Sequence, residues 1–145
     1  MKISLLVVGK LKKNGGFCEM DEFYRKRVKI YSNLDVIELK EKQNIKDQTE
    51  TIKKSIPANS YVVALREEGK KFDSMKFSGL LKKAFEQKGH ICFVIGGSYG
   101  FESIGEDLAL SIAPWTLPHQ LARVNVLEQI YRGLSIQKGS NYHHG

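Results

Sequence analysis

Five short runs of apolar and β-branched residues recur along the chain, and segments with helical spacing separate most of them. The runs occupy residues 2–8, 34–39, 61–65, 91–95 and 108–113. Strands that alternate with helices are typical of a mostly parallel sheet covered by helices on both faces. This one feature therefore predicts an α/β fold.

The segments between the runs differ in how strongly they favour helix. Residues 17–32 and 74–88 carry apolar side chains at helical spacing, and Pro118 suits the first turn of a long last helix. The apolar stripe of that helix consists of Leu121, Val124, Leu127, Tyr131 and Leu134. Three segments are less regular. The polar residues 40–56 read as a weak helix or mobile loop, 67–70 as a turn and 102–107 as a short helix.

Length and composition predict a single domain over residues 1–145 in a reducing, cytoplasmic compartment. No apolar run approaches the roughly 20 residues that span a bilayer, and the first residues read as a strand, not a signal peptide. Cys18 and Cys92 are far apart in the sequence, and the four histidines form no ligand set. The sequence therefore predicts no metal site and no membrane partner.

The positive charge is concentrated in the first part of the chain. The whole chain has a net charge of +7, whereas residues 1–90 contain 20 Lys and Arg against 12 Asp and Glu, a net charge of +8. Such a region can face an anionic polymer such as RNA, or it can be a set of solvated, lysine-rich helix faces. Composition leaves both interpretations open.

Two loops in the C-terminal half have the composition of ligand-binding segments. Residues 96–100, Gly-Gly-Ser-Tyr-Gly, follow a strand and match neither a dinucleotide fingerprint nor a P-loop, so a structural turn and a ligand loop stay equally open. Residues 112–119 contain two prolines, which stiffen a loop whose backbone could read an adenine edge. The alternative is a rigid connection with Trp115 as core filler.

Taken together, these segments resemble the RlmH (YbeA) family of the SPOUT superfamily of methyltransferases, in order and over the whole chain. The matching segments are Val8-Gly9-Lys10, Leu65 with Gly69-Lys70, residues 93–100, 116–120, Arg123-Val124, residues 128–132 and Tyr142-His143. The resemblance implies a homodimer whose C-terminal segment forms a trefoil knot, an exception to the usual unknotted topology.

The resemblance also implies the reaction. Members of the family bind S-adenosyl-L-methionine in the knot and methylate N3 of a pseudouridine in 23S ribosomal RNA, near the decoding region of assembled ribosomes. The positions that match the family's cofactor contacts are Leu65, Gly96, Ile112, Ala113, Pro114, Trp115, Thr116 and Leu117.

The family places the C-terminal tail at the reaction centre. We expect His143 to handle the acceptor proton, and Tyr142 and Arg132 to position the acceptor base. His119 and Arg123 are expected to be structural or to contact the substrate. The tail itself should be mobile until the cofactor orders it, and the stripe of the last helix should supply the dimer interface.

The chain departs from the family pattern at four positions. Arg66 follows Leu65, at a position where the family commonly has an acidic residue. Ala113 stands where the family usually has Ser, and Trp115 stands where it has Met or Leu. His144 replaces the cation that usually ends the chain. Two other functional classes also fit parts of the sequence. A basic RNA-binding protein without chemistry accounts for the charge, and a flavin- or nucleotide-binding α/β protein accounts for the glycines, although their late position disfavours it.

Overall fold

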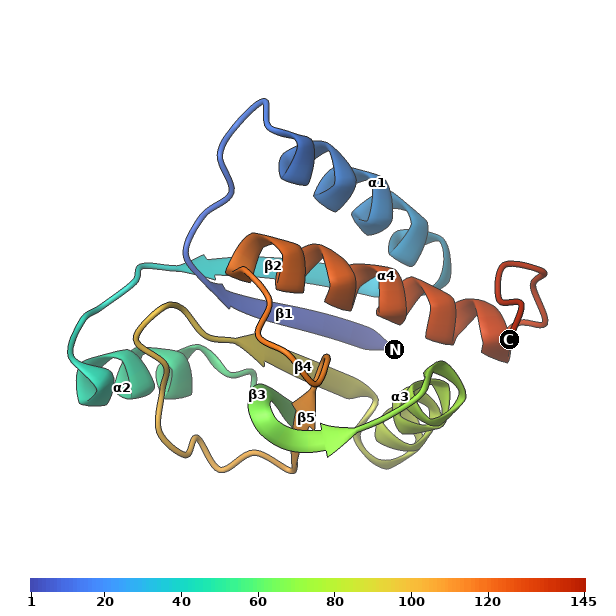
Figure 1. Ribbon diagram of the computed structural model, residues 1–145. Coiled ribbons are helices and arrows are strands. Elements are labelled where there is room, and N and C mark those ends of the chain that lie inside the picture. The colour runs from blue at the N-terminus through green and yellow to red at the C-terminus, as the bar shows by residue number, and fades with distance from the viewer.

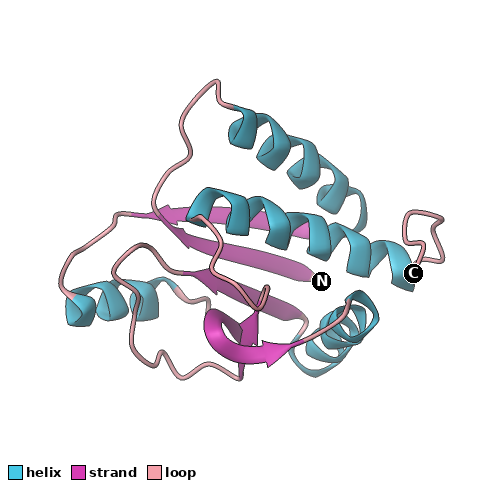
Figure 2. Ribbon diagram, viewed as in Figure 1, coloured by secondary structure: helices cyan, strands magenta, loops and turns pink.

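A computed structural model describes all 145 residues, which form one five-stranded parallel sheet flanked by helices (Figures 1 and 2). In chain order the elements are β1 (Lys2–Val8), α1 (Gly16–Tyr31), β2 (Asn33–Leu39), α2 (Ile45–Ser55), β3 (Tyr61–Lys71), α3 (Ser74–Lys88), β4 (His90–Ile95), β5 (Leu108–Ser111) and α4 (His119–Gln137). The strand order is β2-β1-β4-β3-β5, and every neighbouring pair is parallel. The α/β prediction is therefore confirmed.

Side chains alternate between the two faces of the sheet, and each face has its own core. Ile3 and Phe93 belong to a cluster of 20 buried residues that also includes α1, α3 and α4, whereas Leu6 and Val94 point to a cluster of nine on the opposite face. That second face is covered by α2, through Ile52, and by the loop between β4 and β5, through Phe101. The loop thus takes the place that a helix would otherwise occupy.

Two local predictions were wrong, and both errors concern the region around the functional site. Residues 102–107 form no helix but an extended loop, because side chains from β3 and α2 bind its backbone. The predicted turn at 67–70 is instead a continuation of β3, which bulges after Leu65 and pairs again with β5 at Lys70. Gly69 permits this path, since a Cβ there would lie 2.7 Å from the backbone of Leu110.

The polar segment 40–56, whose sequence fits a weak helix or a loop, is a helix over Ile45–Ser55. Asn44 caps α2 by accepting hydrogen bonds from the backbone N–H groups of Lys46 and Asp47. Ile52 anchors the helix in the smaller core. The side chain of the buried Gln48 binds the loop before the helix at Lys40 and Lys42.

The stripe of α4 lies inside the chain and does not form a free surface. Val124, Leu127, Tyr131 and Leu134 are buried because α4 crosses the sheet between α1 and α3 (Figure 1). Only Leu121 of the predicted stripe is exposed. The expectation that this stripe forms a dimer interface is therefore wrong.

No helix is both long enough and apolar enough to cross a bilayer. No group of three or more His, Cys, Asp or Glu side chains is placed to hold a metal ion.

Candidate active site

A cavity of about 620 Å³ opens at the carboxyl ends of β3, β4 and β5. This edge of a parallel sheet is where α/β proteins generally bind ligands. Three segments wall the cavity: the extension of β3, the glycine loop after β4 and the proline loop between β5 and α4. Its volume lies within the range of small-molecule and cofactor sites. We refer to it as the first cavity.

The first cavity brings together most of the residues predicted to contact a cofactor. Seven of the eight line it, namely Leu65, Gly96, Ile112, Ala113, Trp115, Thr116 and Leu117. Pro114 does not line it. Trp115 is 71% exposed, so it forms part of the rim and is not the core filler that the alternative interpretation required.

Side chains of other segments pack against the glycine loop and hold it in place. A Cβ at Gly96 would lie 2.7 Å from the ring of Phe101, and one at Gly97 would overlap the carboxylate of Glu41. That carboxylate accepts a hydrogen bond of 2.7 Å from the backbone N–H of Ser98. These two glycines are therefore required by close packing, and they leave backbone exposed along one wall of the cavity.

Arg66, a departure from the family pattern, holds the loop between β4 and β5. Its Nε donates to Glu106 at 2.6 Å, and its two terminal nitrogens donate to the carbonyls of Phe101 and Glu102 at 2.9 and 2.8 Å. The guanidinium also lies 4.2 Å from the centre of the Phe101 ring. Burial acts to raise the pKa of Glu106, but the hydrogen bonds and charge around it, chiefly from Arg66, lower it overall. Arg66 therefore acts as a clamp on one wall of the first cavity.

The mouth of the cavity is bridged by a single hydrogen bond. The hydroxyl of Thr116, in the proline loop, donates to a carboxylate oxygen of Glu67 at 2.9 Å. Both residues line the cavity and both are exposed. This bond connects the extension of β3 to the proline loop.

His119 and Arg123, at the start of α4, have different surroundings. His119 lines the first cavity and packs against Gly9, and its buried Nδ1 has no hydrogen-bond partner. Arg123 is 2% exposed and donates to Asp21 and Glu38, both at 2.7 Å. Burial acts to raise the pKa of Glu38, but the hydrogen bond and charge of Arg123 lower it overall. Of the two roles left open for Arg123, the structure supports the structural one.

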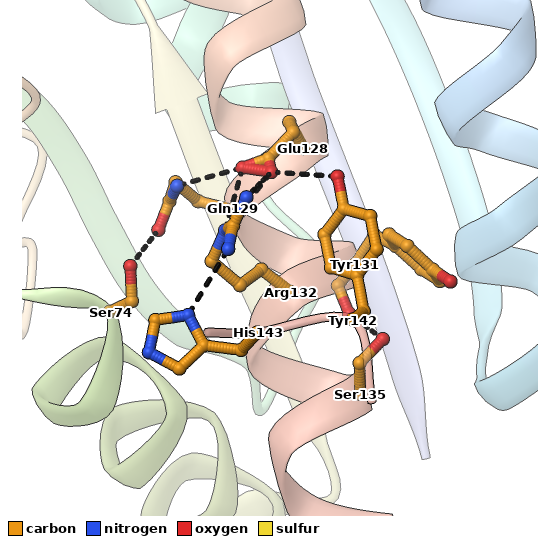
Figure 3. Close-up of polar contacts among 8 residues, drawn as sticks. All are labelled: Ser74, Glu128, Gln129, Tyr131, Arg132, Ser135, Tyr142 and His143. Atoms are coloured by element: carbon orange, nitrogen blue, oxygen red, sulfur yellow. Dashed lines mark hydrogen bonds and ion pairs between the residues drawn. The ribbon is translucent and has the colours of Figure 1, made fainter. Parts of the chain in front are cut away.

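The three residues predicted to be catalytic meet at the far end of α4 (Figure 3). Arg132 Nη1 lies 3.1 Å from His143 Nδ1, and its guanidinium lies 4.8 Å from the centre of the Tyr142 ring. Glu128 binds both partners, accepting from Arg132 Nη2 at 3.0 Å and from the Tyr142 hydroxyl at 3.2 Å. We call these four residues the tail cluster.

The prediction of a mobile tail is not supported by this packing. Tyr142 packs against the main core and lies edge-on to Tyr131, with 4.6 Å between ring centroids. Burial, the neighbouring Tyr24 hydroxyl and the Glu128 carboxylate raise the pKa of Tyr142 to about 12, so its hydroxyl keeps its proton at neutral pH. The hydrogen bond to Glu128 raises the pKa of Arg132, which stays cationic.

Sequence reasoning did not single out Glu128 as a site residue. The sequence does contain a signal for Glu128: it precedes Arg132 by four positions, and charged residues at that spacing lie on one face of a helix, where they can pair. The tail cluster is also separate from the first cavity. Arg132 follows His119 by thirteen positions along α4, which is about 20 Å along a helix.

The model of the family described as "Predicted SPOUT methyltransferase" matches residues 1–143. The chain belongs to the SPOUT methyltransferase family. It is therefore an enzyme that transfers methyl groups, which decides against a non-catalytic RNA-binding protein and against a flavin- or nucleotide-binding one.

Similar proteins cover the chain almost completely. Proteins named "Ribosomal RNA large subunit methyltransferase H" from Metamycoplasma arthritidis, Gemmatimonas aurantiaca and Streptococcus equi subsp. zooepidemicus are 37%, 36% and 40% identical to it. Each alignment covers 99% of this chain and 99% of the relative. The resemblance to the RlmH family is thereby confirmed.

Proposed function

We propose that this SPOUT methyltransferase methylates N3 of a pseudouridine in 23S ribosomal RNA, using S-adenosyl-L-methionine and acting on assembled ribosomes in the cytoplasm. The observation that carries the proposal is the first cavity, because seven residues selected for cofactor contact surround one space. The names of the full-length relatives support the large ribosomal subunit as the substrate.

The lining of the first cavity fits S-adenosylmethionine. Leu65, Ile112 and Leu117 supply apolar contacts for an adenine ring, and the glycine loop presents backbone without intervening side chains. Glu67 is an acceptor at the mouth for ribose hydroxyls. When bound there, S-adenosylmethionine supplies a methyl group on a sulfonium, which is already activated for transfer.

The contribution of the chain is then to hold the acceptor base and stabilise its charge. The reaction forms an N3–CH3 bond, breaks the S–CH3 bond and releases the N3 proton to water. Loss of that proton leaves negative charge on the imide, which the permanent cation Arg132 stabilises; because the tail cluster lies about 20 Å along α4 from the first cavity of its own chain, a second copy of the chain has to supply it. His143 adds a hydrogen-bond donor, because a guanidinium cannot accept and Nδ1 must therefore accept from Arg132, leaving the proton on Nε2. Tyr142 steadies Glu128, which holds Arg132.

The trefoil knot is part of this proposal. The extension of β3 crosses close to the backbone of β5 at Gly69, and Arg66 connects the same strand to the loop before β5. The segment leading to α4 lines the same cavity as the extension of β3, and this proximity supports the proposed knot.

The homodimer is also part of this proposal. Phe17 and Met20 of α1 and Leu121 of α4 are exposed apolar side chains on two helices that contact each other. Together with Trp115 at the cavity rim they offer an apolar surface that a second copy could cover. The interface proposed here replaces the buried stripe of α4.

The direct test uses ribosomes that lack the modification. The purified protein and isotopically labelled S-adenosylmethionine are incubated with these ribosomes, and the RNA is digested to nucleosides for mass spectrometry. We expect label in N3-methylpseudouridine from 23S RNA and none from 16S RNA. Label in another nucleoside, or only in free RNA and not in ribosomes, would overturn the proposed specificity.

A further inference from the structure

Three hydrogen bonds join α3 to α4 at a regular spacing. The Ser74 hydroxyl donates to the side-chain oxygen of Gln129 at 3.0 Å. One turn further along, the Ser78 hydroxyl donates to the backbone carbonyl of Gly133 at 2.7 Å, and the Gln137 amide donates to the backbone carbonyl of Ser78 at 2.9 Å. The participating residues recur every four positions along each helix, so they lie on the facing sides of the two helices. We call these three contacts the α3–α4 seam.

Only the first contact of the seam continues into the tail cluster. The other two end on backbone carbonyls, whereas the side-chain nitrogen of Gln129 donates to the Glu128 carboxylate at 2.9 Å (Figure 3). The amide makes both bonds in one orientation only, because its oxygen accepts from Ser74 and its nitrogen donates to Glu128. Ser74 therefore determines which way the amide of Gln129 points.

Hydrogen bonds, and not packing, hold this amide. Ser74 and Gln129 both line a second cavity, of about 360 Å³, which shares Leu65, Ser111 and Ile112 with the first. A side chain at the wall of a cavity has no neighbouring atoms on that side to fix its orientation. Because Ser74 and Gln129 are half-buried, the hydrogen bond between them is stronger than it would be in open water.

Gln129 is the only residue outside the tail cluster whose side chain donates to Glu128. Oxygen Oε1 of the carboxylate accepts from Gln129 at 2.9 Å and from Arg132 Nε at 3.0 Å. Oxygen Oε2 accepts from Arg132 Nε and Nη2 at 3.1 and 3.0 Å, and from the Tyr142 hydroxyl at 3.2 Å. Arg132 and Tyr142 are the groups that the carboxylate itself holds. The bond from Gln129 therefore ties the tail cluster to the frame of the two helices.

The orientation of the Glu128 carboxylate decides which N–H bonds of Arg132 remain free. A guanidinium has five N–H donors in a planar fork. Nε and Nη2 face Glu128, and Nη1 faces Nδ1 of His143. One N–H bond on each of Nη1 and Nη2 is left without a partner in the chain. Because a carboxylate that pairs with two guanidinium nitrogens shares their plane, a turn of the carboxylate would also turn these two donors.

We propose that Gln129 is a positioning residue for the methyl-transfer reaction: held by Ser74, it fixes the Glu128 carboxylate and so directs the two free N–H bonds of Arg132 toward the substrate. Gln129 acts through Glu128 and does not touch the substrate. This inference rests on the proposed function, because Arg132 is the cation that the proposed reaction uses.

The test compares two glutamines of the same seam. Gln129→Met keeps the length of the side chain and removes the amide. Gln137→Met is the matched control, because it removes a hydrogen bond of the seam that does not reach Glu128. Ser74→Ala removes the hydroxyl and Ser74→Thr keeps one, so the test does not depend on a single variant folding well. For each protein, kcat and KM are measured by methylation of unmodified ribosomes, and the Kd for S-adenosylhomocysteine by calorimetry.

We expect Gln129→Met to lower kcat about tenfold, while the KM for ribosomes and the Kd for S-adenosylhomocysteine change less than about twofold. Ser74→Ala should lower kcat about threefold, because the amide keeps its bond to Glu128 but loses its fixed orientation. Ser74→Thr should retain clearly more activity than Ser74→Ala, and Gln137→Met should match the wild type. In an Arg132→Met background, Gln129→Met should lower kcat no further, since no guanidinium is left to position.

Unchanged kcat in both Gln129→Met and Ser74→Ala would overturn the positioning role. An equal loss in Gln137→Met would overturn it as well, because it would assign the effect to packing of the whole seam. A further loss of kcat in the Arg132→Met background would have the same consequence. In each of these cases an active wild type leaves the proposed function intact, whereas failure of the wild type to methylate ribosomes would contradict the proposed function itself.

Discussion

At the scale of single residues, Arg132 determines which ring nitrogen of His143 carries the proton. Because Nδ1 accepts from the guanidinium at 3.1 Å, the neutral ring carries its proton on Nε2. A ring in that state donates a hydrogen bond and does not remove a proton through Nε2. The sequence predicted His143 as the group that handles the proton, and the geometry favours a donor that stabilises the charge left behind.

Two replacements of His143 separate these roles. His143→Ala should lower kcat about 100-fold, as expected when one donor to a developing anion is lost. His143→Gln keeps an N–H donor and should retain clearly more activity than His143→Ala. Turnover of ribosome methylation with saturating cofactor is the measurement. If both variants are equally inactive, His143 acts as a base and the donor role is wrong.

The raised pKa of Tyr142 predicts a stability difference at high pH. A group whose pKa in the folded state lies above its unfolded value of 10 adds stability below pH 10. That stability is lost as the pH rises toward about 12. Tyr142→Phe keeps the ring against Tyr131 and removes the titration, so its free energy of unfolding should fall less than that of the wild type between pH 9 and pH 11. Urea unfolding at several pH values tests this, and parallel curves for the two proteins would contradict it.

At the scale of elements, the sequence predicts what lies in regular periodic patterns and misses what depends on distant partners. The strands β1 and β4 and the helices α1, α3 and α4 follow from apolar spacing. The extended form of residues 102–107 depends on Arg66, which lies 36 positions before Glu102, and no local sequence pattern predicts that contact. Likewise, the apolar stripe of α4 predicts that one face of the helix is buried, but the sequence does not show that α1 and α3 of the same chain cover it.

Most residues of the candidate site could be predicted from the sequence, but their arrangement in space could not. Family resemblance identified Leu65, Gly96 and the loop 112–117, but not that Pro114 would be missing from the lining of the cavity. Resemblance also gave Arg132, Tyr142 and His143 without Glu128, the carboxylate that holds two of them.

The Arg66 clamp should control both stability and cofactor affinity. Arg66→Met leaves Glu106 and two carbonyls without their partner, and we expect a loss of about 2 kcal/mol in the free energy of unfolding. Because the released loop is a wall of the first cavity, the Kd for S-adenosylhomocysteine should rise about tenfold. The pKa of Glu106 lies below its unfolded value of 4.5, so the difference in stability should be complete above pH 4.5 and should shrink as the pH falls below 4.5 and through the lowered pKa of the folded state.

A surface ion pair provides the control for this clamp. Lys2 and Asp35 lie 3.0 Å apart and are about half exposed, so Lys2→Met should cost less than about 0.5 kcal/mol and leave cofactor binding unchanged. Equal effects of Lys2→Met and Arg66→Met would show that Arg66 is an ordinary surface charge.

At the scale of the whole molecule, the exposed apolar surface predicts self-association. Sedimentation of the wild type at micromolar concentration should give a dimer. The double variant Met20→Asp with Leu121→Asp should give a folded monomer, because it places charges on the proposed interface. Ile30→Asp, at an exposed isoleucine near the other end of α1, should stay dimeric. A wild-type monomer that still methylates ribosomes would contradict the dimer.

The central claim is that the first cavity holds the methyl donor, and calorimetry with S-adenosylhomocysteine tests it most directly. Three proteins are compared: the wild type, Ala113→Phe, which enlarges a residue lining the cavity, and Ala58→Phe, which makes the same change at an exposed alanine elsewhere. We predict one molecule bound per chain in the wild type and in Ala58→Phe with equal Kd, and a Kd at least tenfold higher in Ala113→Phe. The absence of binding to the wild type, or an unchanged Kd in a folded Ala113→Phe, would contradict the account.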